Sequence, residues 1–369
     1  MNAVFTGGGT GGHLYPAIAV ADALRESSDA VIDFVGVAGR LESTIVPKAG
    51  YRLHTVRSAP LDRSFSLKSL GTAAINVCGV AQSIGALWRL RPSIVVATGG
   101  YVCFPVVLAA RILTSIRRMD CRIALLEPNA KPGLTNRLLA PLVDEVWGAF
   151  AHSNGRFSRK YVHTGIPVRA ALRTLGARAE ACSRLGLSPS RRTLLAMGGS
   201  QGARSINDSV ASLLASGGLP PDWQVVLITG EREYGRVRAL LGRDDPAVRP
   251  YLDDLGDAYA AADLILARAG ASTIGELIAL RKPSILVPYP HAAEDHQRHN
   301  AAILDQAGAA IMVDDRDLVD GKLGAILTDA TSPARLRALS FAAARLGDVD
   351  PIPTILARVR ALTARMTAP

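Results

Sequence analysis

The sequence predicts an α/β protein with two domains, each built around a parallel β-sheet. The chain has 369 residues, which is enough for two domains because a domain takes roughly 100–200 residues. Short apolar runs alternate with longer segments of helical periodicity, a pattern typical of βαβ units. In both halves an apolar run leads into a glycine-rich segment and then into a helical pattern. We therefore expect one α/β domain in each half.

The first half contains three predicted strands, at Ala3–Thr6, Val31–Val35 and Ile94–Thr98. The first strand leads into the segment Gly-Gly-Gly-Thr-Gly-Gly-His, which ends at His13. Pro16 follows closely, and since proline is favoured in the first turn of a helix, we expect a helix to start there. The third strand leads into a second pair of glycines.

The second half repeats this order of strand, glycine loop and helix. Its predicted strands are Thr193–Met197, Gln224–Thr229, Asp263–Ala267 and Ser284–Pro288. The first of these leads into Gly-Gly-Ser-Gln-Gly-Ala, residues 198–203. The second domain is therefore expected to contain the same kind of parallel sheet as the first.

The boundary between the domains is expected in the segment 151–169, which is polar, basic and rich in turn-forming residues. We expect an N-terminal domain over residues 1–165 and a C-terminal domain over residues 166–349. After prolines at 351 and 353, an amphipathic helical pattern continues to Met366.

The basic charge of the chain is concentrated in one window. The net charge is +10, and residues 46–137 hold 13 Lys and Arg against 3 Asp and Glu. A localised cationic surface implies an anionic partner, such as nucleic acid, an acidic lipid surface or a phosphorylated substrate. Aromatic residues make up only 5% of the chain, and they do not alternate with basic residues as in proteins that stack bases. The composition therefore argues against nucleic acid as a partner.

The same window contains an uncharged run, Leu70–Trp88, whose length is close to that of a membrane span. Glycines and polar residues lower its hydrophobicity, and its apolar residues share one helical face, namely Val77, Val80, Ile84, Leu87 and Trp88. The run is interpreted as a core-facing helix or as a helix whose apolar end lies in a membrane interface. A true span is the least favoured interpretation. At an interface, neighbouring arginines would contact anionic head groups: Arg89, Arg91, Arg111, Arg117 and Arg118.

Neither a disulfide framework nor a metal site is expected. The four cysteines are far apart and form no C-x-x-C pair, so the chain is expected to be reduced and intracellular. No charged-then-apolar leader precedes the first strand, so export is not expected. His291, His296 and His299 with Asp295 lack the spacing of common metal ligands. The D-x-D sequence at residues 315–317 is interpreted as solvated surface.

The first glycine segment matches G-x-G-x-x-G at Gly7, Gly9 and Gly12. Glycines let backbone N–H groups approach an anion, and the N-terminus of the following helix attracts negative charge. A dinucleotide site also needs an acidic residue at the end of the second strand, and residues 36–40 contain none. An NAD-dependent oxidoreductase is therefore disfavoured, and the missing Gly-Lys-Ser/Thr excludes a Walker loop.

The glycine loop at 198–203 has the same physical character as the first. Taken alone, it is explained equally well by a tight turn between strand and helix that needs small residues. Two such loops, one in each α/β half, favour a phosphate-containing ligand bound in a cleft between the halves.

Glu276 has two interpretations. Thr273 and Glu276 have the spacing of a capping box, which makes Glu276 a helix cap. In the functional interpretation, the Glu276 carboxylate accepts hydrogen bonds from neighbouring sugar hydroxyls.

Six motifs, in this order, are similar to those of the MurG family of UDP-N-acetylglucosamine transferases. They are GGGTGGHLYPAIAVADAL, ATGGYV, EPNAKPGLTNRLLA, GIPVR, MGGSQGARSIN and RAGAST…E…VPYPHAAEDHQ…N. The resemblance covers about residues 2–313. It implies the GT-B fold, in which two Rossmann-like domains face each other across a cleft. A C-terminal helix, here residues 350–369, is then expected to return to the first domain.

The resemblance also implies an activity and a location. Members of the family transfer N-acetylglucosamine from UDP-N-acetylglucosamine to the muramyl sugar of lipid I, which yields lipid II for peptidoglycan synthesis. The anomeric configuration inverts, and neither a catalytic metal nor a cofactor is required. The protein is expected at the cytoplasmic face of the inner membrane, as a peripheral protein. Its anionic membrane contact corresponds to the Leu70–Trp88 helix and its basic surroundings.

Site residues are implied position by position. Contacts with UDP-N-acetylglucosamine are expected at Thr10, Gly11, Gly12, Asn129, Arg169, Ser200, Leu252, Ala271, Ser272, Thr273, Ile274, Gly275, Glu276 and Gln297. His13 is our candidate catalytic base, because a helix N-terminus disfavours the imidazolium form. Alternatively, His13 caps its helix or bonds to a phosphate. Glu127, in the same motif as Asn129, is the second expected catalytic residue.

Five positions differ from the usual motifs of the family. Leu126 and Pro128 stand where the family has His and Gln, Ile166 stands where it has Asn, and Cys103 and Phe104 replace small residues after the second glycine pair. A related GT-B UDP-sugar transferase with a different acceptor is therefore a second hypothesis. A third hypothesis is a membrane-associated protein that binds a nucleotide sugar without catalysis.

Overall fold

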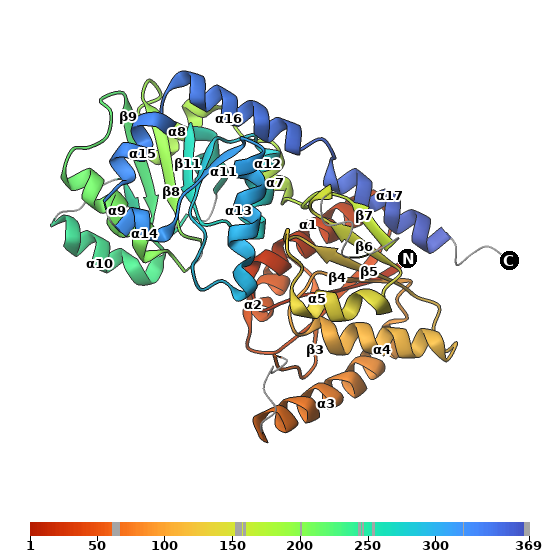
Figure 1. The fold of residues 1–369 in the computed structure, drawn as a ribbon. Coiled ribbons are helices and arrows are strands. Elements are labelled where there is room, and N and C mark those ends of the chain that lie inside the picture. Colours follow the sequence, from red (N-terminus) through yellow and green to blue (C-terminus); the bar gives the residue numbers. More distant parts are fainter. Residues whose placement is uncertain are drawn as a thin grey trace. The chain divides into compact units, whose positions relative to one another are not determined.

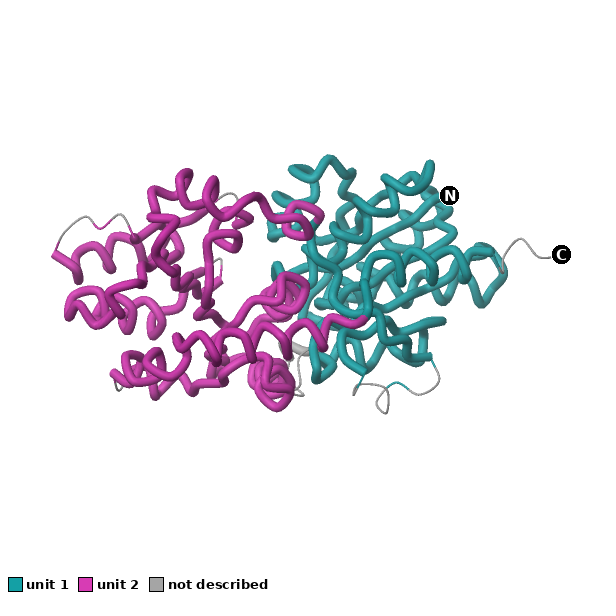
Figure 2. Tube along the Cα trace, turned by 90° about the horizontal axis from the view of Figure 1, so that it is seen from above, with its two compact units in different colours: residues 1–169, 349–369 teal, residues 170–348 magenta. Residues whose placement is uncertain are grey.

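The chain folds into two compact units, which are coloured separately in Figure 2. The computed structural model describes residues 1–60, 67–151, 157, 160–199, 201–242, 245, 247–252, 255–319 and 321–364. The first unit comprises residues 1–169 and 349–369, and the second comprises residues 170–348. The division after Arg169 lies slightly beyond the expected boundary at residue 165.

The first unit contains a seven-stranded sheet with the order β3-β2-β1-β4-β5-β6-β7 (Figure 1). All of its neighbouring strands are parallel. The strands are β1 (Asn2–Thr6), β2 (Val31–Gly36), β3 (Arg52–Thr55), β4 (Ile94–Ala97), β5 (Arg122–Glu127), β6 (Glu145–Gly148) and β7 (Tyr161–His163). The three strands that the sequence predicts correspond to β1, β2 and β4 to within one residue at each end.

Helices cover both faces of this sheet, as parallel strands require. They are α1 (Gly11–Ser27), α2 (Leu41–Lys48), α3 (Leu67–Leu90), α4 (Cys103–Ser115), α5 (Leu134–Leu139) and α17 (Pro351–Ala364), with the short 3-10 helix η1 (Ala140–Leu142). Alternate residues of the central strand β1 enter two different cores. Phe5 packs in a core that includes residues of α1, α2 and α17, whereas Val4 packs in a core that includes residues of α3, α4 and α5.

The helix α1 begins earlier than the sequence predicts. It starts at Gly11 with Thr10 as its N-cap residue, so Pro16 lies inside the helix rather than at its start. Proline has no N–H group, and the Gly12 carbonyl therefore receives no hydrogen bond from residue 16. The first turn of α1 thus keeps a carbonyl acceptor that an uninterrupted helix would use internally.

The helix α3 buries only part of the apolar face that the sequence predicts. Leu87 is fully buried, and Val80 and Ile84 are partly buried against the core, but Val77 and Trp88 are 69% and 42% exposed. Among the described residues of α3, the other buried ones are small or polar: Asn76, Gly79, Ser83 and Ala86. Space is short here, since a Cβ on Gly79 would lie 2.0 Å from the Arg57 carbonyl oxygen. None of the helices in the described part of the chain is long and apolar enough to cross a membrane.

The C-terminal helix α17 belongs to the core of the first unit. Its apolar residues Ile352, Ile355, Val359 and Leu362 have helical spacing and are buried together with residues of α1 and β1. The helix begins at Pro351, where the missing N–H group of proline costs nothing. Figure 1 shows α17 lying along the first unit beside α1 and β7.

An ion pair with a buried carboxylate also holds α17. Arg358 Nε donates to Glu145 Oε2 at 3.0 Å, and Arg358 Nη2 donates to Glu145 Oε1. The Glu145 side chain is only 9% exposed, and Trp147 Nε1 donates to the same Oε2 atom at 3.0 Å. The carboxylate is thereby matched by donors from both the sheet and the helix.

The second unit contains a six-stranded parallel sheet with the order β10-β9-β8-β11-β12-β13. Its strands are β8 (Arg192–Met197), β9 (Trp223–Ile228), β10 (Val248–Arg249), β11 (Leu264–Ala267), β12 (Ser284–Leu286) and β13 (Ala310–Met312). The four strands that the sequence predicts correspond to β8, β9, β11 and β12 to within two residues at each end. This order is that of a Rossmann fold, and the first six strands of the other sheet follow it too.

The helices of the second unit follow its strands in the same alternating order. They are α7 (Ala170–Arg173), α8 (Arg178–Leu185), α9 (Arg204–Ala215), α10 (Glu231–Leu241), α11 (Leu255–Ala261), α12 (Ala271–Ala279), α13 (His296–Gln306), α14 (Asp315–Val319), α15 (Leu323–Ala330) and α16 (Pro333–Leu346), with the 3-10 helix η4 (Ala293–Asp295). One large core joins α9 with the sheet, α14 and α15.

We predict that Arg358→Met lowers the free energy of unfolding of the first unit by about 2–4 kcal/mol, because Glu145 then stays buried without its cationic partner. Urea unfolding measures this change. The control is Arg360→Met on the exposed side of the same helix, which should change stability by at most about 0.5 kcal/mol. Equal effects of the two variants would show that the ion pair does not hold α17.

Candidate active site

Within each unit, the strand order brings two glycine-containing loops side by side. In the first unit, β1 and β4 are neighbours at the point where the strand order reverses. Open α/β sheets bind ligands beyond the carboxyl ends of such strands. The loop of residues 7–10 follows β1, and Gly99 and Gly100 follow β4. In the second unit, β8 and β11 form the corresponding pair.

The two loops of the first unit touch through their backbones. Gly8 N donates to the Gly99 carbonyl oxygen at 3.3 Å. Gly99 has a φ of +106°, and a Cβ atom there would lie 2.6 Å from His13 Nδ1. A larger residue at this position would therefore displace the His13 ring.

Glu42 holds the first glycine loop, although no sequence motif indicates it. Its side chain is buried, and its Oε2 accepts from Gly9 N at 3.3 Å while its Oε1 accepts from Val37 N at 3.1 Å. The amides of Gly8 and Gly9 are therefore used inside the protein. The first turn of α1 is therefore the part of this segment that can meet a ligand.

The position of Glu42 also bears on the dinucleotide hypothesis. Val37 directly follows β2, so the carboxylate lies at the end of the second strand, where a dinucleotide-binding protein places its ribose-binding acid. Here both carboxylate oxygens bond to backbone amides. The geometry therefore gives the dinucleotide hypothesis no support.

His13 lies in the first turn of α1 and is half-buried. Its Nδ1 is 2.8 Å from the Thr98 carbonyl oxygen. Because a carbonyl oxygen only accepts hydrogen bonds, Nδ1 carries the hydrogen, and the neutral ring has its lone pair on Nε2. This is the tautomer that a general base needs, with its orientation set by a backbone group.

Arg169 brings a positive charge to the start of α1. Its guanidinium lies 4.6 Å from the centroid of the Tyr15 ring, a distance typical of a cation–π contact. Tyr15 in turn packs on the first turn, since a Cβ on Gly11 would lie 3.0 Å from Tyr15 Cε2. The structure thus brings Arg169 together with Gly11 and its neighbours Thr10 and Gly12.

Glu127 shapes the loop that carries Asn129. Its Oε1 accepts from Asn129 N at 2.9 Å and from Asn129 Nδ2 at 3.1 Å. Its Oε2 accepts from Gly133 N at 3.2 Å and from Asn136 Nδ2 at 2.8 Å. Burial raises the pKa of Glu127 to about 7, although these four hydrogen bonds act to lower it. With both oxygens engaged, the geometry favours a positioning role for Glu127 over a direct catalytic one.

In the second unit, the loop after β8 closes on itself and on the neighbouring loop. Gly202 N donates to the Gly199 carbonyl oxygen at 2.9 Å. Gly202 has a φ of +76°, and a Cβ atom there would lie 2.0 Å from the Thr229 carbonyl oxygen. Ser200, one of the expected contacts, lies outside the described residues. The following helix α9 has Ala203 as its N-cap residue and no side-chain cap.

The helix α12 also starts without a side-chain cap. It begins at Ala271 with Gly270 as its N-cap residue, so Ser272 and Thr273 lie in its first turn. The expected capping box is wrong, because Thr273 lies inside the helix instead of before it. Uncapped helix N-termini such as those of α9 and α12 are common anion-binding sites, since first-turn amides point out of the helix.

Glu276 lies in the second turn of α12 and is nearly buried, with 7% exposure. Its Oε2 accepts a hydrogen bond from Tyr259 Oη at 2.6 Å. Gly275 is also buried. Ile274 is fully buried, so only its backbone can reach a ligand. Tyr259 is a partner that the sequence motifs did not indicate, because it belongs to a different helix, α11.

Gln297 lies at the start of α13, which packs beside α12. Its Oε1 accepts from Tyr289 N at 2.9 Å, while its Nε2 donates no hydrogen bond among the described residues. Leu252 is half-buried and follows the edge strand β10. No hydrogen bond within the described part of the chain joins Leu252 to residues 271–276 of α12. The second unit thus brings residues 271–276 together with Gln297.

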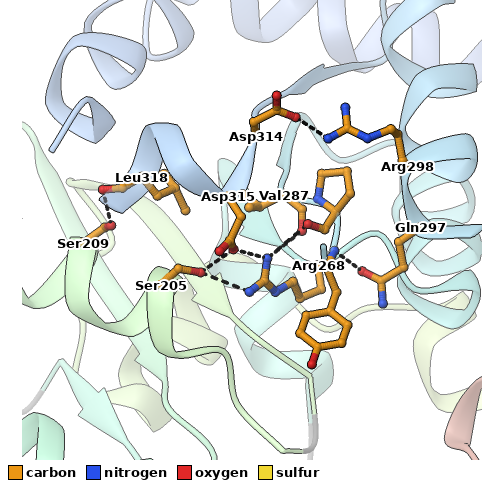
Figure 3. A network of polar contacts seen from close by, with 11 residues as sticks. Ser205, Ser209, Arg268, Val287, Gln297, Arg298, Asp314, Asp315 and Leu318 are labelled. Carbon is orange, nitrogen blue, oxygen red and sulfur yellow. Dashed lines mark hydrogen bonds and ion pairs between the residues drawn. The ribbon is translucent and has the colours of Figure 1, made fainter. Parts of the chain in front are cut away.

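Within the described residues, no group of three or more His, Cys, Asp and Glu side chains is arranged to hold a metal ion. The expectation of a solvated D-x-D sequence is wrong for its first member. Asp315 accepts from Arg268 Nη1 and from Ser205 Oγ, both at 2.5 Å (Figure 3). The second member, Asp317, forms a surface ion pair with Lys322 at 2.7 Å.

The two parallel sheets, each with a glycine loop at its switch point, define an α/β protein with the GT-B fold. Residues 3–147 match the glycosyltransferase family 28 N-terminal domain. Residues 193–345 match the glycosyltransferase family 28 C-terminal domain. Each match falls within one unit of the structure.

Curated relatives define the family more closely. A UDP-N-acetylglucosamine–N-acetylmuramyl-(pentapeptide) pyrophosphoryl-undecaprenol N-acetylglucosamine transferase of Chlorobium luteolum is 43% identical over 330 residues, which are 86% of this chain and 87% of the relative. A protein of the same name from Desulforudis audaxviator is 38% identical and covers 100% of both chains. The chain belongs to this family of glycosyltransferases.

Solved structures agree on the fold. The crystal structure of Acinetobacter baumannii MurG has a TM-score of 0.75 at 23% identity and covers 98% of this chain and 99% of that one. A UDP-GlcNAc 2-epimerase of Neisseria meningitidis, bound to UDP-GlcNAc, has a TM-score of 0.66 at 14% identity, with 98% and 100% coverage. These likenesses establish the two-domain architecture.

We predict that the first unit loses stability between pH 4.5 and about 7 as Glu127 ionises. The folded chain holds this proton more tightly than the unfolded chain, since the pKa of Glu127 is raised from 4.5 to about 7. Stability therefore falls as the pH rises through this window, by about 3 kcal/mol from this group. Urea unfolding at pH 5 and pH 8 measures the loss.

Glu127→Gln should remove this part of the pH dependence, because the amide does not titrate. The control is Glu26→Gln, which changes an exposed glutamate on α1 and should keep the wild-type profile. A Glu127→Gln profile identical to wild type would contradict the assignment.

Proposed function

We propose that the protein transfers N-acetylglucosamine from UDP-N-acetylglucosamine to the muramyl sugar of lipid I, with inversion at the anomeric carbon. The product is lipid II for peptidoglycan synthesis. The observation that carries this proposal is the 38–43% identity to curated relatives of this activity over most of both chains. The uncapped helix starts and the glycine loops of the second unit support it physically.

The second unit is proposed to bind the donor. A diphosphate carries negative charge, and the uncapped N-termini of α9 and α12 favour such charge. Ser200, Ala271, Ser272 and Thr273 would meet the nucleotide there. Gln297, whose Oε1 is already used by Tyr289 N, would offer its Nε2 to a sugar hydroxyl.

Further donor contacts complete the proposed set. Glu276 is proposed to accept hydrogen bonds from sugar hydroxyls. Ile274 and Gly275 would contribute backbone atoms, and Leu252 would pack against the base. From the first unit, the proposed contacts are Thr10, Gly11, Gly12, Asn129 and Arg169.

His13 is proposed to be the catalytic base. As the acceptor hydroxyl oxygen bonds to the anomeric carbon, the bond from that carbon to the diphosphate oxygen breaks and UDP leaves. His13 Nε2 takes the hydroxyl proton, while Nδ1–H stays bonded to the Thr98 carbonyl oxygen. The developing charge on UDP is stabilised by the oriented amides of the helix starts and by the Arg169 guanidinium.

The motif departures at residues 126, 128 and 166 place apolar side chains in buried positions. Leu126 is a buried member of the core around α1, and Ile166 is 6% exposed. Pro128 is buried in the loop that Glu127 shapes. None of these side chains offers a new polar group on the surface that could bind a different acceptor.

The ends of α3 and α4 are proposed to contact an anionic membrane at the cytoplasmic face. Arg91 Nη1 donates to the Arg118 carbonyl oxygen at 3.0 Å, and its guanidinium lies 4.0 Å from the Trp88 ring centroid. Ile116 beside them is 58% exposed. Exposed apolar side chains next to arginines fit a lipid interface, where rings and methyl groups enter the head-group region and cations pair with phosphates.

We predict that UDP is released from UDP-N-acetylglucosamine only when a soluble lipid I analogue is added. His13→Ala should lower kcat by about 10²–10⁴-fold with little change in donor affinity, because proton transfer is lost. Glu276→Ala should instead raise the KM for the donor, because a binding contact is lost. His54→Ala, which removes a partner of Asp33 at the edge of the same sheet, is the control and should leave both constants close to wild type.

Other outcomes of this assay would contradict the proposal. UDP release with another acceptor, but not with the lipid I analogue, would indicate a related transferase. Saturable donor binding without UDP release for any acceptor would indicate a non-catalytic binder. Loss of donor binding in His13→Ala with normal turnover at saturation would remove His13 as the base.

We predict that Arg117→Gln with Arg118→Gln weakens binding to vesicles of phosphatidylglycerol and phosphatidylcholine by about 30-fold, at about 1 kcal/mol for each basic residue. Vesicle sedimentation measures the partition. The matched control, Arg337→Gln with Arg345→Gln on the exposed side of α16, removes the same charge from the second unit. Equal losses in both double variants would place the membrane contact elsewhere.

A further inference from the structure

Arg268 lies at the centre of a polar cluster in the second unit (Figure 3). It directly follows β11, and its side chain is only 11% exposed. Its Nη1 donates to the carbonyl oxygens of Val287 at 3.2 Å and Pro288 at 3.3 Å, and to Asp315 Oδ1 at 2.5 Å. Its Nη2 donates to Ser205 Oγ at 3.0 Å, and Ser205 Oγ donates to the same Asp315 oxygen.

The cluster joins four segments that lie far apart in the sequence. Ser205 belongs to the first turn of α9, just after the glycine loop. Arg268 immediately precedes the loop that starts α12, and Val287 with Pro288 follows β12. Asp315 is the first residue of α14. Ser205 follows the proposed contact at residue 200, Arg268 precedes the contact at Ala271 by three residues, and Pro288 precedes Gln297 by nine. The helix α14 contains no proposed donor contact.

The segment after β12 also contacts a residue of the proposed donor site. Tyr289, which follows Pro288, donates its N–H to Gln297 Oε1, and the Arg268 guanidinium lies 5.6 Å from the Tyr289 ring centroid. Asn300 Nδ2 donates to the carbonyl oxygen of Ala269 at 3.1 Å. The arginine thus lies three residues before the start of α12 and contacts Tyr289, which bonds to Gln297 at the start of α13.

The position of the Arg268 side chain depends on the negative charge of Asp315. Within the described residues, Asp315 is the only carboxylate that forms an ion pair with Arg268. A guanidinium that is nearly buried needs a matching negative charge, and without it the side chain moves toward water. Such a movement would release the two carbonyl oxygens after β12 and Ser205 together.

We propose that Asp315, acting through Arg268 and Ser205, is a positioning residue that sets the affinity for the sugar-nucleotide donor. This inference rests on the proposed function. Asp315 touches none of the proposed donor contacts directly. Its effect is to hold the starts of α9 and α12 and the segment that supports Gln297 at the spacing that the donor requires.

The test compares the two aspartates of α14 in the full-length enzyme. Asp315→Asn should raise the KM for UDP-N-acetylglucosamine about 10- to 100-fold, while kcat and the KM for the lipid I analogue change little. Asp317→Asn removes a surface ion pair with Lys322 from the same helix and should leave all three constants close to wild type. An equal donor KM in the two variants would overturn the inference.

A milder variant keeps the test decisive if Asp315→Asn does not fold. Ser205→Ala removes one hydroxyl and leaves Arg268 paired with Asp315, so the donor KM should rise several-fold without a change in the acceptor KM. An unchanged donor KM in Ser205→Ala would overturn the inference in that case. Calorimetry with UDP on the same proteins separates the two proposals: a wild type that binds no UDP contradicts the proposed function itself.

Discussion

In both units the chain passes close to itself where two central strands end, and the rest of the site depends on this close approach. Gly8 and Gly99 meet through their backbones in the first unit, and Gly202 meets Thr229 in the second. Side chains have no room at these crossings. A ligand beyond the strands therefore meets mostly backbone amides, helix starts and the few side chains that the crossings orient, such as His13.

Three loops of the candidate site are each held by a largely buried ionisable side chain. Glu42 bonds to the first glycine loop, Glu127 to the loop of Asn129, and Arg268 to the segment after β12. A buried charge is costly unless several hydrogen bonds match it. The backbone groups that supply those bonds cannot move independently, so each charge makes its loop rigid. Rigid loops suit a site that has to stabilise charge in a transition state.

The sequence predicts the strands at the centre of each sheet, because they are buried on both faces and appear as continuous apolar runs. It does not predict β5 and β6, although they are buried as well. The short edge strands β3, β7, β10 and β13 lack such runs. Of the two interpretations of α3, the core-facing one is wrong for Val77 and Trp88, because the packing of this helix depends on the space beside Gly79 rather than on hydrophobicity alone.

The glycine loops and His13 could be found from motifs, whereas their supports could not. The Gly9 contact of Glu42 and the Arg268 contact of Asp315 join residues far apart in the sequence. Spacing along one segment carries no signal for such pairs. The Thr273–Glu276 spacing misled the prediction in a different way. This local pattern predicted a helix cap, but the helix starts earlier, after Gly270.

The return of α17 to the first unit has a consequence for biosynthesis. Residues 352–362 fill part of the core built by α1 and β1, yet they are translated only after the whole second unit, residues 170–348. The apolar surface of the first unit that α17 covers therefore stays exposed on the nascent chain until the second unit has been translated. We therefore expect chaperones to bind this apolar surface during translation. We also expect chains that end before α17 to be degraded.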